Sequence, residues 1–141
     1  MMEKKYELVA WTKNINDKDN ARLYVKPSVE LELIGPQIDA ISECRKEQKA
    51  NNGHITPKLA RKFARTYEEA AKLDAFTGKI DYAISFYLQA AHYCTYHFSL
   101  AQDYTRLCDE AITLAQKHGF QHILREEKHK HILTAKIKRC A

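Results

Sequence analysis

The spacing of apolar residues predicts a mainly helical chain after residue 35. Apolar side chains recur three and four positions apart, which is the period of an amphipathic helix. The predicted helices cover residues 36–50, 57–76, 81–97 and 99–117. A fifth, weaker segment over 121–138 has apolar residues on both sides of the polar run REEKHKH. A frayed helix or a helix followed by a short strand would fit this segment.

Capping residues mark the ends of these predicted helices. Thr56 and Pro57 suit a helix start, because a threonine hydroxyl can accept a bond from a free N–H and proline lacks an N–H there. Gly53, Gly78 and Gly119 follow three of the helices and can adopt the left-handed conformation that ends a helix. The pattern therefore predicts four or five antiparallel helices.

The first part of the chain has a different pattern. Residues 4–12 and 21–26 are rich in β-branched and aromatic residues, and the run NINDKDN between them consists of turn formers. This pattern predicts a β-hairpin. Residues 28–34 alternate apolar residues with glutamates, which indicates a third strand with one solvated face. Because Glu and Leu also favour helices, a short helix capped by Ser28 is the alternative.

We expect Gly35-Pro36 to end that element. The chain then divides into an N-terminal β unit, residues 1–34, and a helical bundle, residues 35–141. The predicted fold class is mainly α, of the α+β type, with the two units forming one compact domain.

Small and aromatic residues in the second and third predicted helices follow the spacing of a known repeat. They are Tyr67, Ala70, Ala71, Gly78, Ala83, Tyr87 and Ala90. In this pattern residues 64–91 resemble a tetratricopeptide repeat. Ala71 and Ala83 would let two helix backbones approach closely, and Gly78 would permit a tight reversal between them.

The chain also departs from that family. Asp74 stands where the family usually has an aromatic residue, and Lys117 would occupy the small-residue position of a second copy. We therefore expect tetratricopeptide-like helix pairs rather than a regular array. Since such stacks usually need three or more units, the N-terminal hairpin or a second subunit in a homodimer should cover the exposed helix faces.

The resemblance implies that the chain binds another protein on the concave face formed by the first helix of each pair. That face would present Arg65, Glu68, Lys72 and Ala75. An ordinary solvated face of alternating charge is the alternative explanation of these residues. The resulting hypothesis is a non-catalytic protein-interaction scaffold or adaptor.

Charge distribution supplies a second hypothesis. The 141 residues include 23 Lys and Arg against 18 Asp and Glu, a net charge of +5. The excess lies after residue 116, in a basic patch of Arg125, Lys128, Lys130, Lys136, Lys138 and Arg139. This patch could neutralise phosphates, and Tyr6, Trp11 and Tyr24 could stack on bases. Nucleic-acid association is therefore the alternative function, and a solvated lysine-rich helix is the simpler explanation.

No motif indicates catalysis, a cofactor or a metal. The chain has no glycine-rich phosphate loop and no G-x-S-x-G nucleophile motif, so we predict that it is not an enzyme. His92, Cys94 and His97 lack a second Cys/His pair at zinc-site spacing and are predicted to pack in the core or at an interface. His122, Glu126 and His129 share one helical face that could hold a surface divalent ion, and a solvated His-rich face is the explanation that we favour.

Cysteine usage and hydropathy indicate the compartment. The four cysteines form no C-x-x-C pair, and three of them fall on apolar helix stripes, which predicts buried thiols in a reducing environment. No apolar run has the length of a signal peptide or a membrane span. We expect a cytoplasmic protein without membrane association.

Overall fold

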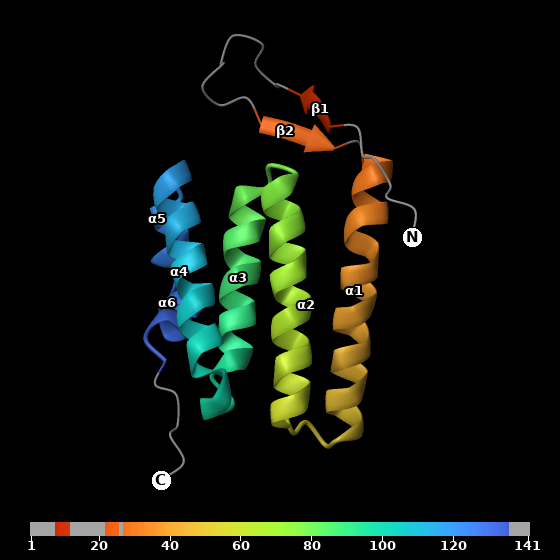
Figure 1. Cartoon of the computed structure of the whole chain (residues 1–141), viewed down its shortest axis with the longest axis vertical. Coiled ribbons are helices and arrows are strands. Elements are labelled where there is room, and N and C mark those ends of the chain that lie inside the picture. The colour runs from red at the N-terminus through yellow and green to blue at the C-terminus, as the bar shows by residue number, and fades with distance from the viewer. Residues whose placement is uncertain (1–7, 12–21, 26, 136–141) are drawn as a thin grey trace.

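The chain folds as a bundle of helices that lie side by side (Figure 1). The computed structural model describes residues 8–11, 22–25 and 27–135, with side chains from residue 35 onward. This described part contains α1 (Pro27–Ala50), α2 (Pro57–Phe76), α3 (Ile80–Cys94), α4 (Ala101–His118), α5 (Gln121–Leu124) and α6 (Glu127–Leu133). A short 3-10 turn, Phe98–Leu100, precedes α4. The mainly helical fold predicted from the sequence is confirmed.

Local chemistry sets the helix ends as predicted. The Thr56 hydroxyl accepts a hydrogen bond from the Leu59 N–H at 3.1 Å, and Pro57 is the first helical residue of α2. Gly78 and Gly119 have φ values of 83° and 75°, in the left-handed region, immediately beyond α2 and α4. These caps fix where the chain reverses.

The α2–α3 pair forms the centre of the core. Alanines on both helices are buried, with Ala71 and Ala83 each 0% exposed, so the two backbones approach closely. Beside them, the rings of Phe63 and Tyr93 stack with centroids 4.1 Å apart and planes 6° from parallel. Close backbone packing and ring stacking therefore join the two helices along their length.

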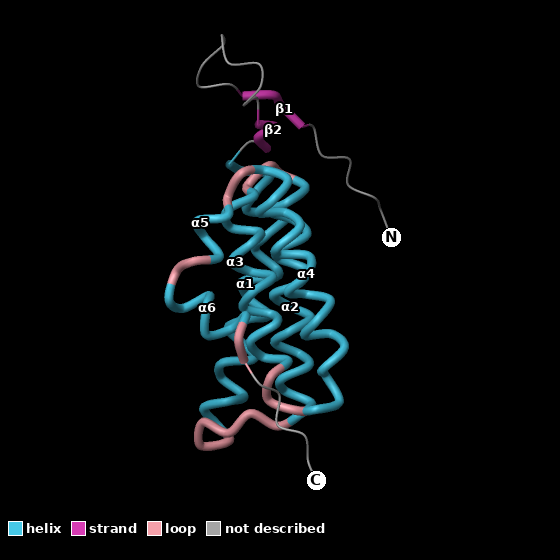
Figure 2. Tube along the Cα trace, turned by 90° about the vertical axis from the view of Figure 1, so that its left-hand side faces the viewer, coloured by secondary structure: helices cyan, strands magenta, loops and turns pink. Residues whose placement is uncertain are grey.

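The remaining helices pack on this pair (Figure 2). α1 packs on α2, where Cys44 is buried and the Arg45 Nη2 donates to the Tyr67 hydroxyl at 3.3 Å. α4 packs on α3 through the buried Leu107 and Ala111. α5 and α6 contact α3, and α5 also contacts α4.

Residues 28–34 are helical, so the third strand that we favoured is wrong. α1 begins at Pro27 and continues through Gly35-Pro36 without ending there. Pro27 suits the first turn of a helix, and the Glu and Leu residues after it have high helix propensity. Pro36 removes one backbone hydrogen bond, and the helix continues past it. α1 thus crosses the boundary that we placed after residue 34, and the division into two units stays a prediction.

The weaker segment over 121–138, for which a frayed helix or a helix followed by a short strand was expected, breaks into two short helices, α5 and α6. Ile123 and Ile132, nine residues apart, would point about 180° from each other on a continuous helix. At the break, Glu126 is extended, with φ −61° and ψ 138°. Both isoleucines are consequently buried, at 7% and 6% exposure. Residues 136–138 lie outside the described residues.

Two short strands precede the helices. β1 (Leu8–Trp11) and β2 (Arg22–Val25) pair antiparallel, with Leu8 opposite Val25 and Trp11 opposite Arg22. Residues 1–7, 12–21 and 26 lie outside the described residues, so the hairpin as a unit stays a prediction.

In the part of the chain that the structure describes, no helix has the length and apolar character needed to cross a membrane.

The close approach at Ala83 yields a stability prediction. Ala83→Leu should overpack the α2–α3 contact and lower the free energy of unfolding by about 1 to 3 kcal/mol. Thermal and urea unfolding measure the change. Ala50→Leu, at an exposed position at the end of α1, is the matched control and should change stability little. An unchanged melting temperature in Ala83→Leu would show that the two backbones do not pack as described.

A buried carboxylate at the end of α2 makes stability depend on pH. Asp74 is 3% exposed, and its burial, together with the negative charge of nearby Asp81, raises its pKa to about 6. Its ordinary pKa is 3.8, so the folded state holds this proton to higher pH than the unfolded chain does. The free energy of unfolding therefore falls as pH rises from about 4 through 6.

Asp74→Asn should remove this dependence, because the amide is neutral at every pH. At pH 7 we expect the variant to be more stable by about 1 to 3 kcal/mol, with no gain at pH 3. Urea unfolding at several pH values measures both, with Asp109→Asn at an exposed site as control. A gain that is equal at pH 3 and pH 7 would refute a titrating buried carboxylate.

Candidate functional site

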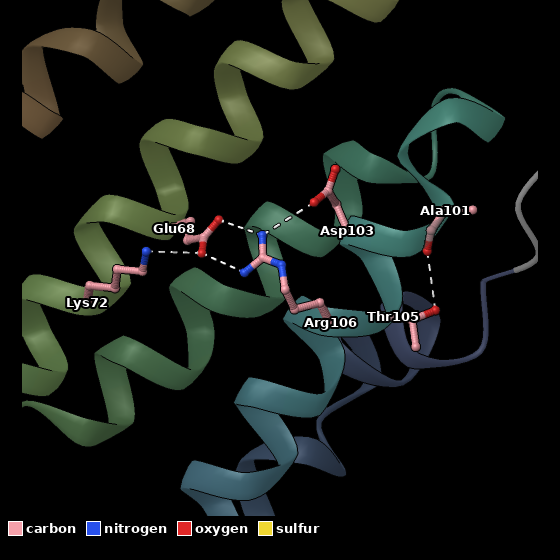
Figure 3. A network of polar contacts seen from close by, with 6 residues as sticks. All are labelled: Glu68, Lys72, Ala101, Asp103, Thr105 and Arg106. Carbon is pink, nitrogen blue, oxygen red and sulfur yellow. Dashed lines mark hydrogen bonds and ion pairs between the residues drawn. The ribbon is translucent and has the colours of Figure 1, made fainter.

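The candidate site lies between α2 and α4, two helices that both pack on α3. Because α3 holds both helices, side chains from the exposed faces of α2 and α4 can meet although they are far apart in sequence. Glu68 on α2 and Arg106 on α4 are 38 residues apart and are in direct contact. Figure 3 shows this contact with its neighbours.

Arg106 holds two carboxylates from different helices. Its Nη1 and Nη2 donate to the two oxygens of Glu68 at 2.7 and 2.9 Å, and its Nη2 also lies 3.4 Å from Asp103 Oδ1. Lys72, one turn after Glu68, approaches the same carboxylate at 3.4 Å. Two parallel bonds from one guanidinium to one carboxylate are the strongest common form of side-chain ion pair. This α2–α4 network therefore fixes the orientation of Glu68 and Arg106.

The network keeps Glu68 charged. The hydrogen bonds from Arg106 lower the pKa of Glu68 below its ordinary value of 4.5, and the partial burial of the carboxylate opposes this effect. Only 13% of the Glu68 side chain is exposed, whereas 47% of the Arg106 side chain is exposed. The site thus presents a fixed pattern of charge at its surface.

A hollow of about 420 Å³ lies beside this network. Its floor consists of buried apolar residues: Ala64, Cys94, Leu100 and Leu107. Its rim is charged and contains Arg61, Arg65, Glu68, Asp103 and Arg106. The hollow therefore combines a small apolar floor with a charged rim.

The buried thiol of the floor is not activated. Burial raises the pKa of Cys94 to about 12, so this group is protonated at neutral pH. The thiols of Cys44, Cys94 and Cys108 are buried and free, which confirms the prediction of buried, reduced cysteines for these three. Cys140 lies outside the described residues.

The residues predicted for partner binding fall in different places. Arg65 and Glu68 line the hollow, and Lys72 joins the network through Glu68. Ala75 is partly exposed on α2 and does not line this hollow. Their role in binding a partner stays a prediction.

Sequence reasoning missed the α4 side of the site. Arg106 and Asp103 complete the rim, together with Arg61 from α2. Asp103 and Arg106 are three residues apart and of opposite charge, a local pattern that could have drawn attention to them. Nothing local indicates that Arg106 also reaches Glu68.

The structure describes only part of the predicted basic patch. Lys128 pairs with Glu126 at 3.6 Å, and Lys130 points about 200° away from Lys128 around α6. Arg125 is exposed at the end of α5. Lys136, Lys138 and Arg139 lie outside the described residues, as do the side chains of Tyr6, Trp11 and Tyr24. Nucleic-acid binding by these residues stays a prediction.

The expected solvated face of His122, Glu126 and His129 is wrong for His129. This side chain is 1% exposed, and its Nδ1 lies 2.7 Å from the Ile123 carbonyl oxygen, so Nδ1 donates. The break at Glu126 turns α6 toward α3 and buries the ring. Among the described residues no group of His, Cys, Asp or Glu is placed to hold a metal ion.

Within the cluster around Cys94, the thiol is buried as predicted, whereas His97 makes exposed hydrogen bonds. The His92 ring meets the rings of Tyr93 and Tyr96 edge to face, with centroids 5.2 and 5.5 Å away. Burial lowers the pKa of His92 below its ordinary value of 6.5. His97 Nδ1 accepts a hydrogen bond from the Ser99 N–H at 3.2 Å and so caps the turn before α4.

Comparison of the chain with models of known protein families, with curated proteins and with solved structures finds no match.

The α2–α4 network yields a test by double-mutant cycle. Combining Glu68→Gln with Arg106→Ala should give a coupling energy of about 1 to 2 kcal/mol at pH 7, because the pair is bidentate and partly shielded. Since the folded-state pKa of Glu68 is depressed, this coupling is fully present above pH 4.5 and is lost as pH falls below that value.

The matched control is the exposed pair Lys46 and Glu43, 3.3 Å apart on α1. Its cycle should give no more than about 0.5 kcal/mol. Equal coupling energies for the two pairs would contradict the structural role of the α2–α4 network.

Proposed function

We propose that this protein is a non-catalytic protein-interaction scaffold or adaptor. It binds its partner in the hollow between α2 and α4 described above, which we call the groove. The observation that carries the proposal is the hollow with an apolar floor and a charged rim, on which Arg106 holds Glu68 and Asp103 in place. Because Arg106, Glu68 and Asp103 are already held in place, less side-chain entropy is lost when a partner binds, which favours recognition.

The finer architecture belongs to this proposal. The α2–α3 hairpin acts as one tetratricopeptide-like helix pair, and α4 begins the next pair. In this arrangement α2 and α4 are the first helices of their pairs and line the groove. Support comes from the fully buried Ala71, Ala83 and Ala90 and from Gly78 at the reversal. The N-terminal hairpin or a second copy of the chain then covers a remaining helix face.

Reduced, buried cysteines support a cytoplasmic location, and the raised pKa of Cys94 argues against a thiol nucleophile in the groove. The proposal therefore assigns the groove to binding rather than to catalysis.

A photo-cross-linking amino acid at the groove tests this function. Placed at Lys72 on α2, it should give one adduct of defined mass in the cells that make the protein. The same group at Lys130, exposed on α6, is the control and should give no such adduct. An excess of unlabelled wild-type protein should compete the adduct away, whereas Arg106→Ala should compete more weakly. Adducts that form equally from both positions, or from neither, would overturn the groove assignment.

A nuclease treatment of the same samples separates the alternative function. An adduct at Lys72 that contains protein and survives nuclease supports the scaffold. Loss of the adduct on nuclease treatment would indicate that nucleic acid brings the components together.

A further inference from the structure

The first half of α2 carries an unusual concentration of positive charge. Residues 57–67 contain Lys58, Arg61, Lys62 and Arg65 and no carboxylate. The N-terminus of a helix already carries about half a positive charge from its backbone dipole, so acidic residues are favoured there and basic residues are not. This arrangement is unfavourable for an isolated helix.

Neighbouring residues relieve only part of this charge. Lys62 pairs with Glu47 of α1 at 3.2 Å. Arg61 and Arg65 are exposed and make no hydrogen bond or ion pair with any described residue. They lie four positions apart, so their like charges face the same side of the helix.

The two carboxylates on the rim of the α2–α4 hollow are already held by another arginine. Glu68 and Asp103, the carboxylates of the same rim, are both held by Arg106. Arg106 of α4 therefore holds both carboxylates of this rim, and the two arginines of α2 pair with neither of them beside the apolar floor.

Arg65 also extends the unpaired charge to the other side of α2. It lines a second, shallower hollow of about 760 Å³ between α1 and α2, along with Cys44 and Thr66. A ligand in the α2–α4 hollow can contact both arginines, and one that extends past Arg65 would reach the α1–α2 hollow.

We propose that the partner of this groove is an acidic peptide segment, whose Asp or Glu side chains pair with Arg61 and Arg65 while an apolar side chain occupies the floor at Leu100 and Leu107. Charge complementarity carries the assignment, because each guanidinium can bind one carboxylate in the bidentate geometry that Arg106 makes with Glu68. This inference rests on the proposed function and names the chemistry of the partner.

A fluorescein-labelled peptide of alternating Glu and Leu serves as the probe, with a Gln and Leu peptide of the same length as its neutral match. Fluorescence anisotropy on the full chain measures both affinities at low and at physiological ionic strength. The wild type should bind the Glu peptide about tenfold more tightly than the Gln peptide. The preference should shrink as salt screens the rim.

Two double variants of equal charge change locate the effect. R61Q/R65Q should weaken binding of the Glu peptide about tenfold, whereas K117Q/R125Q, at exposed positions on α4 and after α5, should change it by less than about twofold. R61E/R65E should reverse the preference and bind a Lys and Leu peptide instead. Melting curves of all variants confirm that the fold is kept.

Equal losses in the two double variants would mean attraction by net charge alone and would overturn the proposal. Failure of the wild type to prefer the Glu peptide would also overturn it. The scaffold function is tested separately, by cross-linking from Lys72 in the R61Q/R65Q variant. An adduct that persists in this variant would support the groove as a partner site and would exclude the acidic contact.

Discussion

The close packing of α2 on α3 is the constraint on which the rest of the structure depends. Alanines such as Ala71 and Ala83 bring the backbones together, and the stacked rings of Phe63 and Tyr93 fill the space beside them. The resulting pair offers one side to α1 and another to α4. Without it, the helices that form the candidate groove would have no common support.

The charges of the groove follow from this support. Because α3 fixes the spacing of α2 and α4, Arg106 can hold Glu68 in a bidentate pair across 38 residues of chain. That contact, together with the one to Asp103, occupies both carboxylates of the rim, and Arg61 and Arg65 pair with neither of them. Packing in the core thus determines which surface charges on the rim are paired and which are not.

Local chemistry made part of the fold predictable. Thr56-Pro57, Gly78 and Gly119 act through their own backbone geometry, so the helix ends that they set were correct. Residues 28–34 were not predictable, because Glu and Leu alternation fits a strand while the same residues favour a helix. The break at Glu126 depends on which apolar neighbours Ile123 and Ile132 find, which no local pattern contains. For the same reason the sequence indicated Arg65 and Glu68 on α2 but not their partner helix α4.

Native-state hydrogen exchange tests the central claim, that the α2–α3 pair is the most stable unit of the bundle. The amides of Ala71 and Ala90, which are buried residues of α2 and α3, should exchange only with the free energy of global unfolding. Amides of α6 should exchange earlier, by local opening of a short helix. Slower exchange in α4 or α6 than at Ala71 and Ala90 would contradict the account, because the groove would then be supported by elements other than the α2–α3 pair.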